Sequence, residues 1–215
     1  MMSKSIDEET ARERQARVAK SGGKWEEYVR LFLNERLEGT GIEVIVGKRE
    51  EEEVKRRSLR LWRMLSLPLK SSTTQETVWG DLDLVAVKDE IPIAVISCKT
   101  SLHGRFTETL FWSLLYRMLT RIKVVLATSD TGTGKTEPLK SEWGTPENPD
   151  KNRLLAESYL DGVYVENVPE FCKLGEPTAL GGIVRPLNEL PQDFIRWGEE
   201  LSKFIYAERR SLKHI

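Results

Sequence analysis

Cysteine and histidine are both scarce in this chain of 215 residues, which contains two of each. The cysteines, Cys98 and Cys172, are too few for a disulfide framework and lack the spacing of a zinc site, so we expect two reduced, buried thiols. The histidines, His103 and His214, are too few for a histidine-rich metal centre. Zinc-finger and histidine-rich metal chemistry are therefore excluded.

Long hydrophobic runs are missing as well. No stretch of about 20 apolar residues is available to span a bilayer. The first twenty residues are highly charged and lack the apolar core of a signal peptide. We therefore expect a cytoplasmic protein with no membrane partner.

The chain also lacks an excess of charge of one sign. Its net charge of −1 gives no overall electrostatic argument for nucleic-acid binding, so local basic clusters would have to provide the contacts. Hydrophobic residues make up 39% and charged residues 31%, which is typical of a folded globular protein. At this length we expect a single α/β domain. Its parts are an N-terminal helical extension (1–20), a core (21–166) with a helical insertion near 50–66, and a C-terminal connection and helix (167–215).

The most informative stretch runs from Trp79 to Ser101. Two alternating apolar runs, Leu82 to Val87 and Ile91 to Ser97, are separated by only three polar residues, which predicts a β-hairpin. Side chains alternate between the two faces of a strand. The polar residues near the strand ends are therefore expected to converge at one place.

These polar residues have the chemistry of a hydrolytic site. Asp81 and Asp83 share one strand face, and Ser97 shares a face with Lys99 on the next strand. A carboxylate that holds a hard cation, beside a lysine that orients or deprotonates a water, is the minimum apparatus for attacking a phosphodiester. An amphipathic strand with polar ends would be the purely structural explanation.

The order of Asp83, a hydrophobic strand and a second strand ending in Ser97-x-Lys99 resembles the PD-(D/E)XK nucleases, especially type II restriction endonucleases with a Ser-x-Lys variant. The usual family residue at position 97 is Asp or Glu. The resemblance implies a Mg²⁺-dependent enzyme, with Mn²⁺ as an alternative ion. It also implies that Asp83 and the backbone carbonyl of Cys98 bind the metal, and that Lys99 positions or deprotonates the attacking water. Asp81 would either support these ligands without touching the metal or be the true metal ligand itself.

Because Ser97 is not acidic, a second carboxylate has to come from a helix, and the resemblance leaves two candidates. Glu26 lies in the first turn of a helix expected from about 24 to 37, where many members of the family place a metal-binding glutamate. Glu108 lies in the first turn of a helix expected from about 106 to 120. Acidic residues in a first turn also stabilise the helix macrodipole, so both have a structural explanation.

Candidate DNA contacts come from three segments. A helix expected near 50–66 would align three arginines on one face. Polar residues follow the second strand of the hairpin, and a lysine lies in the glycine-rich segment SDTGTGKT, which we expect to be a DNA-facing loop. A solvated helix face and ordinary loop residues are the alternatives. The candidate DNA-binding residues are Arg56, Arg60, Arg63, Ser101, His103, Arg105 and Lys135.

The segment SDTGTGKT also resembles a phosphate-binding P-loop without completing the motif. The motif requires glycine at position 129, where this chain has Ser129, and prolines interrupt the helix that should follow. We therefore expect no nucleoside triphosphate partner.

The remaining patterns predict the other elements of the core. We expect a helix to about Lys20, a break at Ser21 to Gly23, and a loop from Lys70 to Thr77. The other expected elements are a strand at 42–46, a central strand at 121–129, a helix at 151–159, a strand at 161–166, an irregular connection at 167–185 and a final helix at about 186–210. This order contains the α-β-β-β-α-β core of the nucleases that the chain resembles, which implies a restriction-endonuclease-like mixed central sheet flanked by helices.

The function implied by the resemblance is that of a type II restriction endonuclease. Such an enzyme would cut double-stranded DNA at a specific site as a homodimer, leaving 5′-phosphate and 3′-hydroxyl ends. A structure-selective nuclease, of the junction-resolvase or repair type, is one alternative. The other is a DNA-binding module without catalytic activity, which the serine at position 97 makes worth testing.

Overall fold

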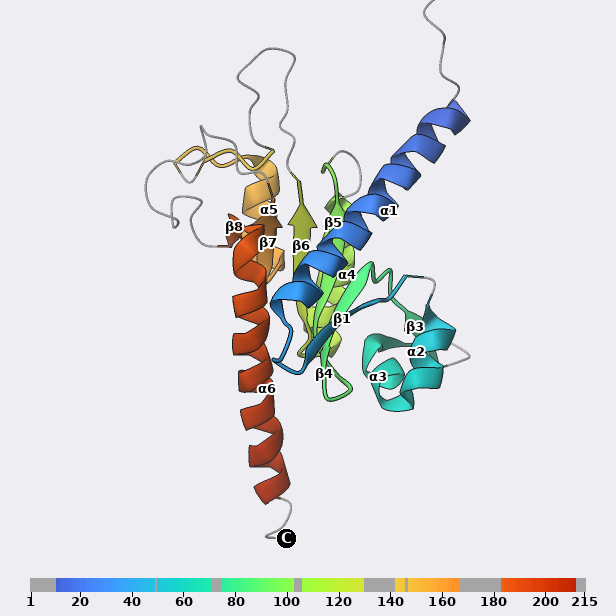
Figure 1. The fold of residues 1–215 in the computed structure, drawn as a ribbon, viewed down its shortest axis with the longest axis vertical. Helices are drawn as coiled ribbons and strands as arrows, with labels where there is room; N and C mark the ends of the chain where they lie inside the picture. Colours follow the sequence, from blue (N-terminus) through green and yellow to red (C-terminus); the bar gives the residue numbers. More distant parts are fainter. Residues whose placement is uncertain are drawn as a thin grey trace, which may run out of the picture.

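The computed structural model describes residues 11–48, 50–70, 75–102, 106–129, 142–145, 147–166 and 183–211 (Figure 1). Its α-helices are α1 (Ala11–Arg36), α2 (Glu51–Arg57), α3 (Leu59–Leu65), α4 (Phe106–Leu119), α5 (Lys151–Tyr159) and α6 (Leu190–Ser211), with a 3₁₀ turn, η3 (Leu187–Glu189). Its strands are β1 (Ile42–Val46), β2 (Ser66–Lys70), β3 (Gln75–Trp79), β4 (Leu84–Lys88), β5 (Ile91–Lys99), β6 (Lys123–Thr128), β7 (Gly162–Val165) and β8 (Val184–Pro186).

Six of these strands form one mixed sheet in the order β1-β4-β5-β6-β7-β8. The strands β1, β4 and β5 pair antiparallel, whereas β5, β6, β7 and β8 pair parallel. A parallel pair needs a crossover, and α4 and α5 provide the crossovers on either side of β6. The expected α/β class with a mixed central sheet is confirmed.

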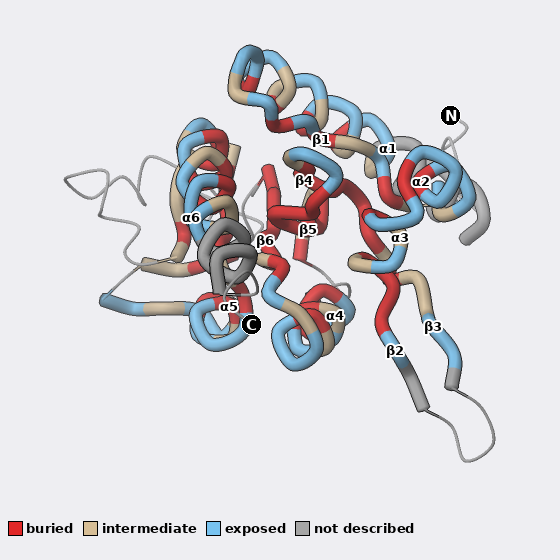
Figure 2. The backbone as a smooth tube through the Cα atoms, turned by 90° about the horizontal axis from the view of Figure 1, so that it is seen from below, coloured by how far each residue is buried: buried red, intermediate tan, exposed pale blue. Residues whose placement is uncertain are grey.

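Helices cover both faces of the sheet, and the alternation along β4 and β5 divides their side chains between two cores. Val85 and Val95 pack on the side of α4 and α5, where Tyr116 is fully buried. Leu84 and Ile96 face the opposite side and pack with residues of α1 and α6. In Figure 2 the buried inner strands lie between α1 on one side and α4 with α5 on the other.

The predicted hairpin is present as β4 and β5, with Leu84 opposite Ile96. Its two-residue turn places Asp89 and Glu90 at φ values of 51° and 60°. A tight hairpin turn of this kind requires positive φ at both central residues, because only that geometry follows the twist of the strands. The register shifts between Ala86 and Val87, beside Pro92, which is where a proline is tolerated within a strand.

The first helix differs from the prediction. We expected a break at Ser21 to Gly23, but α1 continues through these residues. A glycine in a helix costs only about 1 kcal/mol relative to alanine. The buried side chains of Trp25, Val29 and Leu33 fix the following turns against the sheet, which outweighs that local preference. The part of the predicted N-terminal helix that falls within 1–10 lies outside the described residues.

The helical insertion near 50–66 is also different, because it consists of two short helices. Ser58 is extended, with φ −154° and ψ 111°, and separates α2 from α3. Its side chain accepts a hydrogen bond from the backbone N–H of Leu61 and so caps α3. Arg56 therefore belongs to α2, whereas Arg60 and Arg63 belong to α3, and the predicted single face of three arginines is wrong.

Three further strands, β2, β3 and β8, were not predicted. The expected loop from Lys70 to Thr77 is wrong at both ends, because Lys70 belongs to β2 and residues 75–77 belong to β3, and these strands form an antiparallel hairpin that projects from the main body (Figure 2). Residues 71–74 lie outside the described residues. Pro68 within β2 misled the interpretation, but a proline is compatible with a strand that has an open edge. The short strand β8 lies in the expected irregular connection and pairs with β7.

The other predicted elements agree with the structure to within a few residues. These are β1, α4, β6, α5, β7 and α6. Of the helices that the structure describes, not one has the length and apolarity to cross a membrane.

Candidate active site

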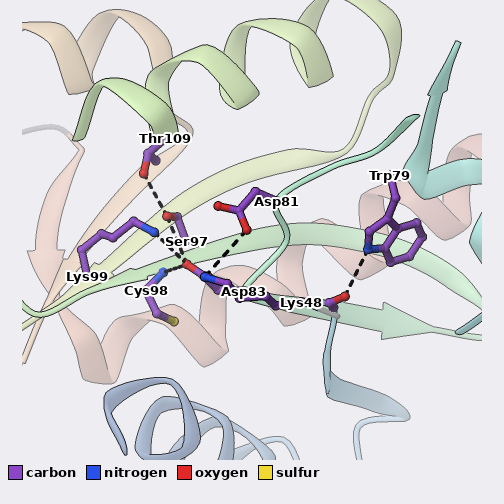
Figure 3. A network of polar contacts seen from close by, with 9 residues as sticks. Lys48, Trp79, Asp81, Asp83, Ser97, Cys98, Lys99 and Thr109 are labelled. Atoms are coloured by element: carbon purple, nitrogen blue, oxygen red, sulfur yellow. Dashed lines mark hydrogen bonds and ion pairs between the residues drawn. The ribbon is translucent and has the colours of Figure 1, made fainter. Parts of the chain in front are cut away.

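The side chain of Asp83 is the centre of a buried polar cluster at the start of β4 (Figure 3). It is only 1% exposed. Its Oδ1 atom accepts a hydrogen bond from Lys48 Nζ at 3.2 Å. Its Oδ2 atom accepts from the backbone N–H of Cys98 at 2.8 Å and from Lys99 Nζ at 3.1 Å. A buried carboxylate needs such partners, because an unpaired charge in this position would be strongly unfavourable.

The hairpin register explains why Asp83 meets these residues. Leu84 pairs with Ile96, so the next step along the strands brings Asp83 beside Ser97. Lys99 lies two residues further along β5 and therefore on the same face as Ser97. The structure thus brings together Asp83, Ser97 and Lys99, as the alternation along the two strands predicted.

Ser97 links the cluster to helix α4. Its hydroxyl lies 2.9 Å from the hydroxyl of Thr109 and 3.5 Å from Asp83 Oδ2. Thr109 is buried, whereas its neighbour Glu108 is exposed. None of the hydrogen bonds or ion pairs of the described residues joins Glu108 to the cluster, and the contact from α4 is made by Thr109, which was not among the predicted site residues. The sequence feature that could have identified Thr109 is its position as a polar residue among the buried apolar residues of this helix.

Lys48 is a second residue that the sequence analysis did not consider. It follows β1, and its ammonium lies 3.8 Å from Asp81 as well as 3.2 Å from Asp83. Partial burial lowers the pKa of Lys48, but the negative charges of Asp83 and Asp81 outweigh this effect and raise it overall. No local pattern connects Lys48 with the aspartates, because 35 residues separate it from Asp83.

Glu26 reaches the neighbourhood of the cluster from α1. It is half-buried, and its pKa is raised, first by burial and then by the negative charge of Asp83. Lys48 and Lys99 oppose this shift. The indole N–H of Trp25 donates to the backbone carbonyl of Ala127 at 3.2 Å, which anchors this turn of the helix on the sheet.

The neighbouring Glu27 has a different environment. It is exposed and forms an ion pair with Arg30 at 2.8 Å, and this hydrogen bond lowers its pKa. Of the two glutamates in this turn of α1, only Glu26 interacts electrostatically with Asp83.

Cys98 contributes its backbone to the cluster. Its side chain lies on the opposite face of β5, in the core formed with α1 and α6, where burial raises the pKa of the thiol well above its ordinary value. In an extended strand the N–H and C=O groups of one residue point to the same side. The carbonyl of Cys98 is therefore expected to point toward Asp83, like its N–H.

The donor set suits a hard divalent cation. The described residues include no ready-made group of three or more histidine, cysteine or acidic side chains that could hold a metal. They do provide the carboxylates of Asp81 and Asp83, and Mg²⁺ is commonly bound by one or two carboxylates while it keeps several waters. Both carboxylates already attract a cation, the ammonium of Lys48.

The candidate DNA-binding residues are not all in one place. Arg60 and Arg63 line an open depression of about 990 Å³ that also includes Ile91, at the opposite end of β5 from Lys99. Arg56 is exposed and pairs with Glu53. Ser101 follows β5 and is half-buried, while His103, Arg105 and Lys135 lie outside the described residues. Their contact with DNA stays a prediction.

Comparison with known proteins identifies a matching family model and a solved structure with a similar fold. A family model described as "BsaWI restriction endonuclease type 2" matches residues 52–182, which is more than half of the chain. This range includes Asp83, Ser97 and Lys99 but neither Glu26 nor Lys48. A search of curated proteins finds no match.

A solved structure has a similar fold. It is described as the crystal structure of a pre-specific restriction endonuclease BsaWI-DNA complex. The TM-score is 0.52 at 15% sequence identity, and the match covers 87% of this chain. This chain spans only 65% of the length of that protein. At this level of identity, the similarity establishes a common fold.

Proposed function

Because the chain belongs to the BsaWI restriction endonuclease type 2 family, we propose that it is a type II restriction endonuclease that hydrolyses double-stranded DNA with Mg²⁺. The observation that best supports this function is the buried pair of Asp83 and Lys99, whose Oδ2 and Nζ atoms are 3.1 Å apart. These are the two residue types that the chemistry requires, a metal-binding carboxylate and a lysine. The DNA in the structurally similar BsaWI complex supports DNA as the substrate.

In this proposal the metal ligands are Asp83, Asp81, the backbone carbonyl of Cys98 and Glu26. Glu26 is preferred over Glu108 because it interacts electrostatically with Asp83 from a half-buried position. A divalent ion, when bound, supplies positive charge that acidifies water and neutralises charge on the phosphate. Mn²⁺ has similar ligand preferences and is expected to substitute for Mg²⁺.

As an ammonium, Lys99 positions the water that attacks the scissile phosphate, and as a neutral amine it would instead accept a proton from that water. Its ammonium is held by Asp83, and only 8% of the residue is exposed, so it has little freedom to turn away. The hydroxyls of Ser97 and Thr109 support this arrangement from α4. The oxygen of the water loses a proton and bonds to phosphorus, the bond from phosphorus to O3′ breaks, and O3′ takes up a proton from solvent. The products are a 5′-phosphate and a 3′-hydroxyl.

A homodimer follows from the same proposal. One cluster around Asp83 cuts one strand, so cleavage of both strands at one site needs two clusters. A two-fold axis relating two copies of the chain would place one cluster at each strand of a palindromic site.

Digestion of a mapped plasmid by the purified protein with Mg²⁺ tests this function. A sequence-specific enzyme gives a fixed set of fragments, whose ends can be ligated and labelled to identify 5′-phosphates. Cleavage restricted to branched substrates would instead identify a structure-selective nuclease. Binding without any hydrolysis, with Mg²⁺ or Mn²⁺, would leave only a DNA-binding module.

A further inference from the structure

Lys48 is a charged member of the cluster that the proposed mechanism does not use. Its ammonium lies 3.2 Å from Asp83 Oδ1 and 3.8 Å from Asp81 Oδ1 (Figure 3). A positive charge therefore already lies within ion-pair distance of two carboxylates that are proposed to bind the metal.

The loop that carries Lys48 is fixed at this place by several contacts. The backbone N–H of Gly47 donates to the carbonyl of Asp83 at 3.2 Å. The carbonyl of Gly47 accepts from the indole N–H of Trp79 at 3.1 Å. A Cβ atom at position 47 would lie 2.7 Å from both Cβ and the carbonyl oxygen of Leu82, so only glycine allows this close approach. The position of Lys48 next to Asp83 thus results from the fold of the loop.

The two oxygens of Asp83 have different partners. Oδ2 accepts from the backbone of Cys98 and from Lys99, which is buried. Oδ1 accepts from Lys48, whose side chain is 35% exposed. A lysine on a flexible four-carbon stem can move into solvent, whereas a buried lysine cannot do so easily. Oδ1 is therefore the oxygen of Asp83 that a metal ion can bind most readily in place of a lysine.

From this arrangement we infer that Lys48 is the resident counter-ion of Asp81 and Asp83 in the metal-free protein, and that a divalent ion binds by displacing its ammonium. The inference rests on the proposed function, because it takes these two aspartates as metal ligands. The ion and the ammonium compete for the same oxygen atoms. The apparent affinity for metal is lower than that of the bare carboxylates, since part of the binding energy is used to release Lys48.

Mn²⁺ binding to the DNA-free protein tests this inference without any cleavage assay. The concentration of free Mn²⁺ is followed by its electron paramagnetic resonance signal at constant ionic strength. The variants are Lys48→Met, which removes the competing charge, and Lys48→Arg, which keeps it. Lys48→Gln provides a polar alternative if the methionine variant folds poorly. Asp83→Ala establishes which part of the binding occurs at this cluster.

Lys123 provides a matched control. Its ammonium lies 3.2 Å from Asp161, and its side chain is 39% exposed, so the pair closely resembles Lys48 and Asp83 in distance and in the exposure of the lysine. The pair lies at the start of β6, at the other end of the sheet from Lys99. Lys123→Met therefore changes the net charge equally, without removing a charge from the cluster.

We expect Lys48→Met and Lys48→Gln to bind Mn²⁺ about tenfold more tightly than the natural protein, a modest factor because a partly exposed charge is screened. Lys48→Arg and Lys123→Met should stay within about twofold of the natural protein. Equal or weaker binding by both neutral Lys48 variants, with binding abolished in Asp83→Ala, would overturn the displacement model alone. Undiminished binding in Asp83→Ala would overturn the proposed metal site and the displacement model together.

Discussion

The ammonium of Lys99 lies 3.1 Å from the carboxylate of Asp83, although 16 residues separate them in the chain. A tight two-residue turn and a fixed strand register bring the two side chains together at the end of β5. Both are almost fully buried, so each charge depends on the other and on the hydrogen bonds around it.

Thr109→Val removes the hydroxyl that contacts Ser97 while it keeps the shape of the side chain. The hydroxyl of Ser97 then loses a buried partner, and we expect the free energy of unfolding to fall by about 1 kcal/mol. Urea denaturation of the metal-free protein measures this change. Thr107→Val is the control, because Thr107 is exposed on the same turn of α4. Equal losses in the two variants would show that the contact has no particular role.

Glu26→Gln and Glu108→Gln distinguish the two candidate sources of the second carboxylate. Glu26 interacts electrostatically with Asp83, whereas Glu108 is exposed on α4. We expect Glu26→Gln to slow DNA cleavage by at least about tenfold, because even the loss of an outer-shell partner of a metal ligand costs about tenfold to a hundredfold. Glu108→Gln should cleave within about twofold of the natural rate. The opposite order of the two rates would assign the carboxylate to α4.

Glu26→Gln also has a predicted effect on stability without metal. Burial and the charge of Asp83 raise the pKa of Glu26 in the folded protein above its ordinary value of 4.5. At a pH above the raised pKa the group is ionised in both states, and folding carries the cost of that shift. As the pH falls through the raised pKa toward 4.5, the folded state binds the proton first and the cost disappears.

We therefore expect Glu26→Gln to raise the melting temperature at pH 8 in a chelating buffer, with a smaller difference at pH 5. Glu27→Gln is the control. The hydrogen bond from Arg30 lowers the pKa of Glu27, so this variant is not expected to have a higher melting temperature. A melting temperature of Glu26→Gln below that of the natural protein at pH 8 would contradict the raised pKa.

The thiol of Cys98 should be unreactive in the folded protein. It is buried, and burial together with the charge of Asp83 raises its pKa, so very little thiolate is present at pH 8. In the Cys172→Ser background, we expect no reaction with a chromogenic disulfide reagent until denaturant is added, and then one thiol. Rapid reaction of the folded protein would mean that this strand opens easily.

The hairpin and its polar pair could be predicted because both depend on local sequence. Alternation along β4 and β5 determines which residues share a face, and the short turn determines the register. The 17 consecutive residues 83–99 are therefore sufficient to predict that Asp83, Ser97 and Lys99 lie close together. The resemblance of this spacing to the PD-(D/E)XK nucleases then supplied the interpretation of these residues as a catalytic site.

The rest of the cluster depends on contacts between distant segments. Lys48 reaches Asp83 only because the loop after β1 packs against Leu82, and no periodic pattern indicates that contact. Thr109 and Glu108 lie on different sides of α4. The sequence does not fix the residue at which this helix begins, so it does not show which of the two sides faces the sheet. Helix α1 continues through Gly22 and Gly23 because packing further along outweighs a weak local preference.

Cleavage by Asp83→Ala in single-turnover conditions with Mg²⁺ tests the central claim most directly, with a mapped plasmid that the natural protein cuts. Loss of this carboxylate should reduce the cleavage rate by at least about a thousandfold. DNA binding, measured by electrophoretic mobility shift without metal, should change only a few-fold. Mg²⁺-dependent cutting by Asp83→Ala at the natural rate would contradict the assignment of this cluster as the catalytic centre.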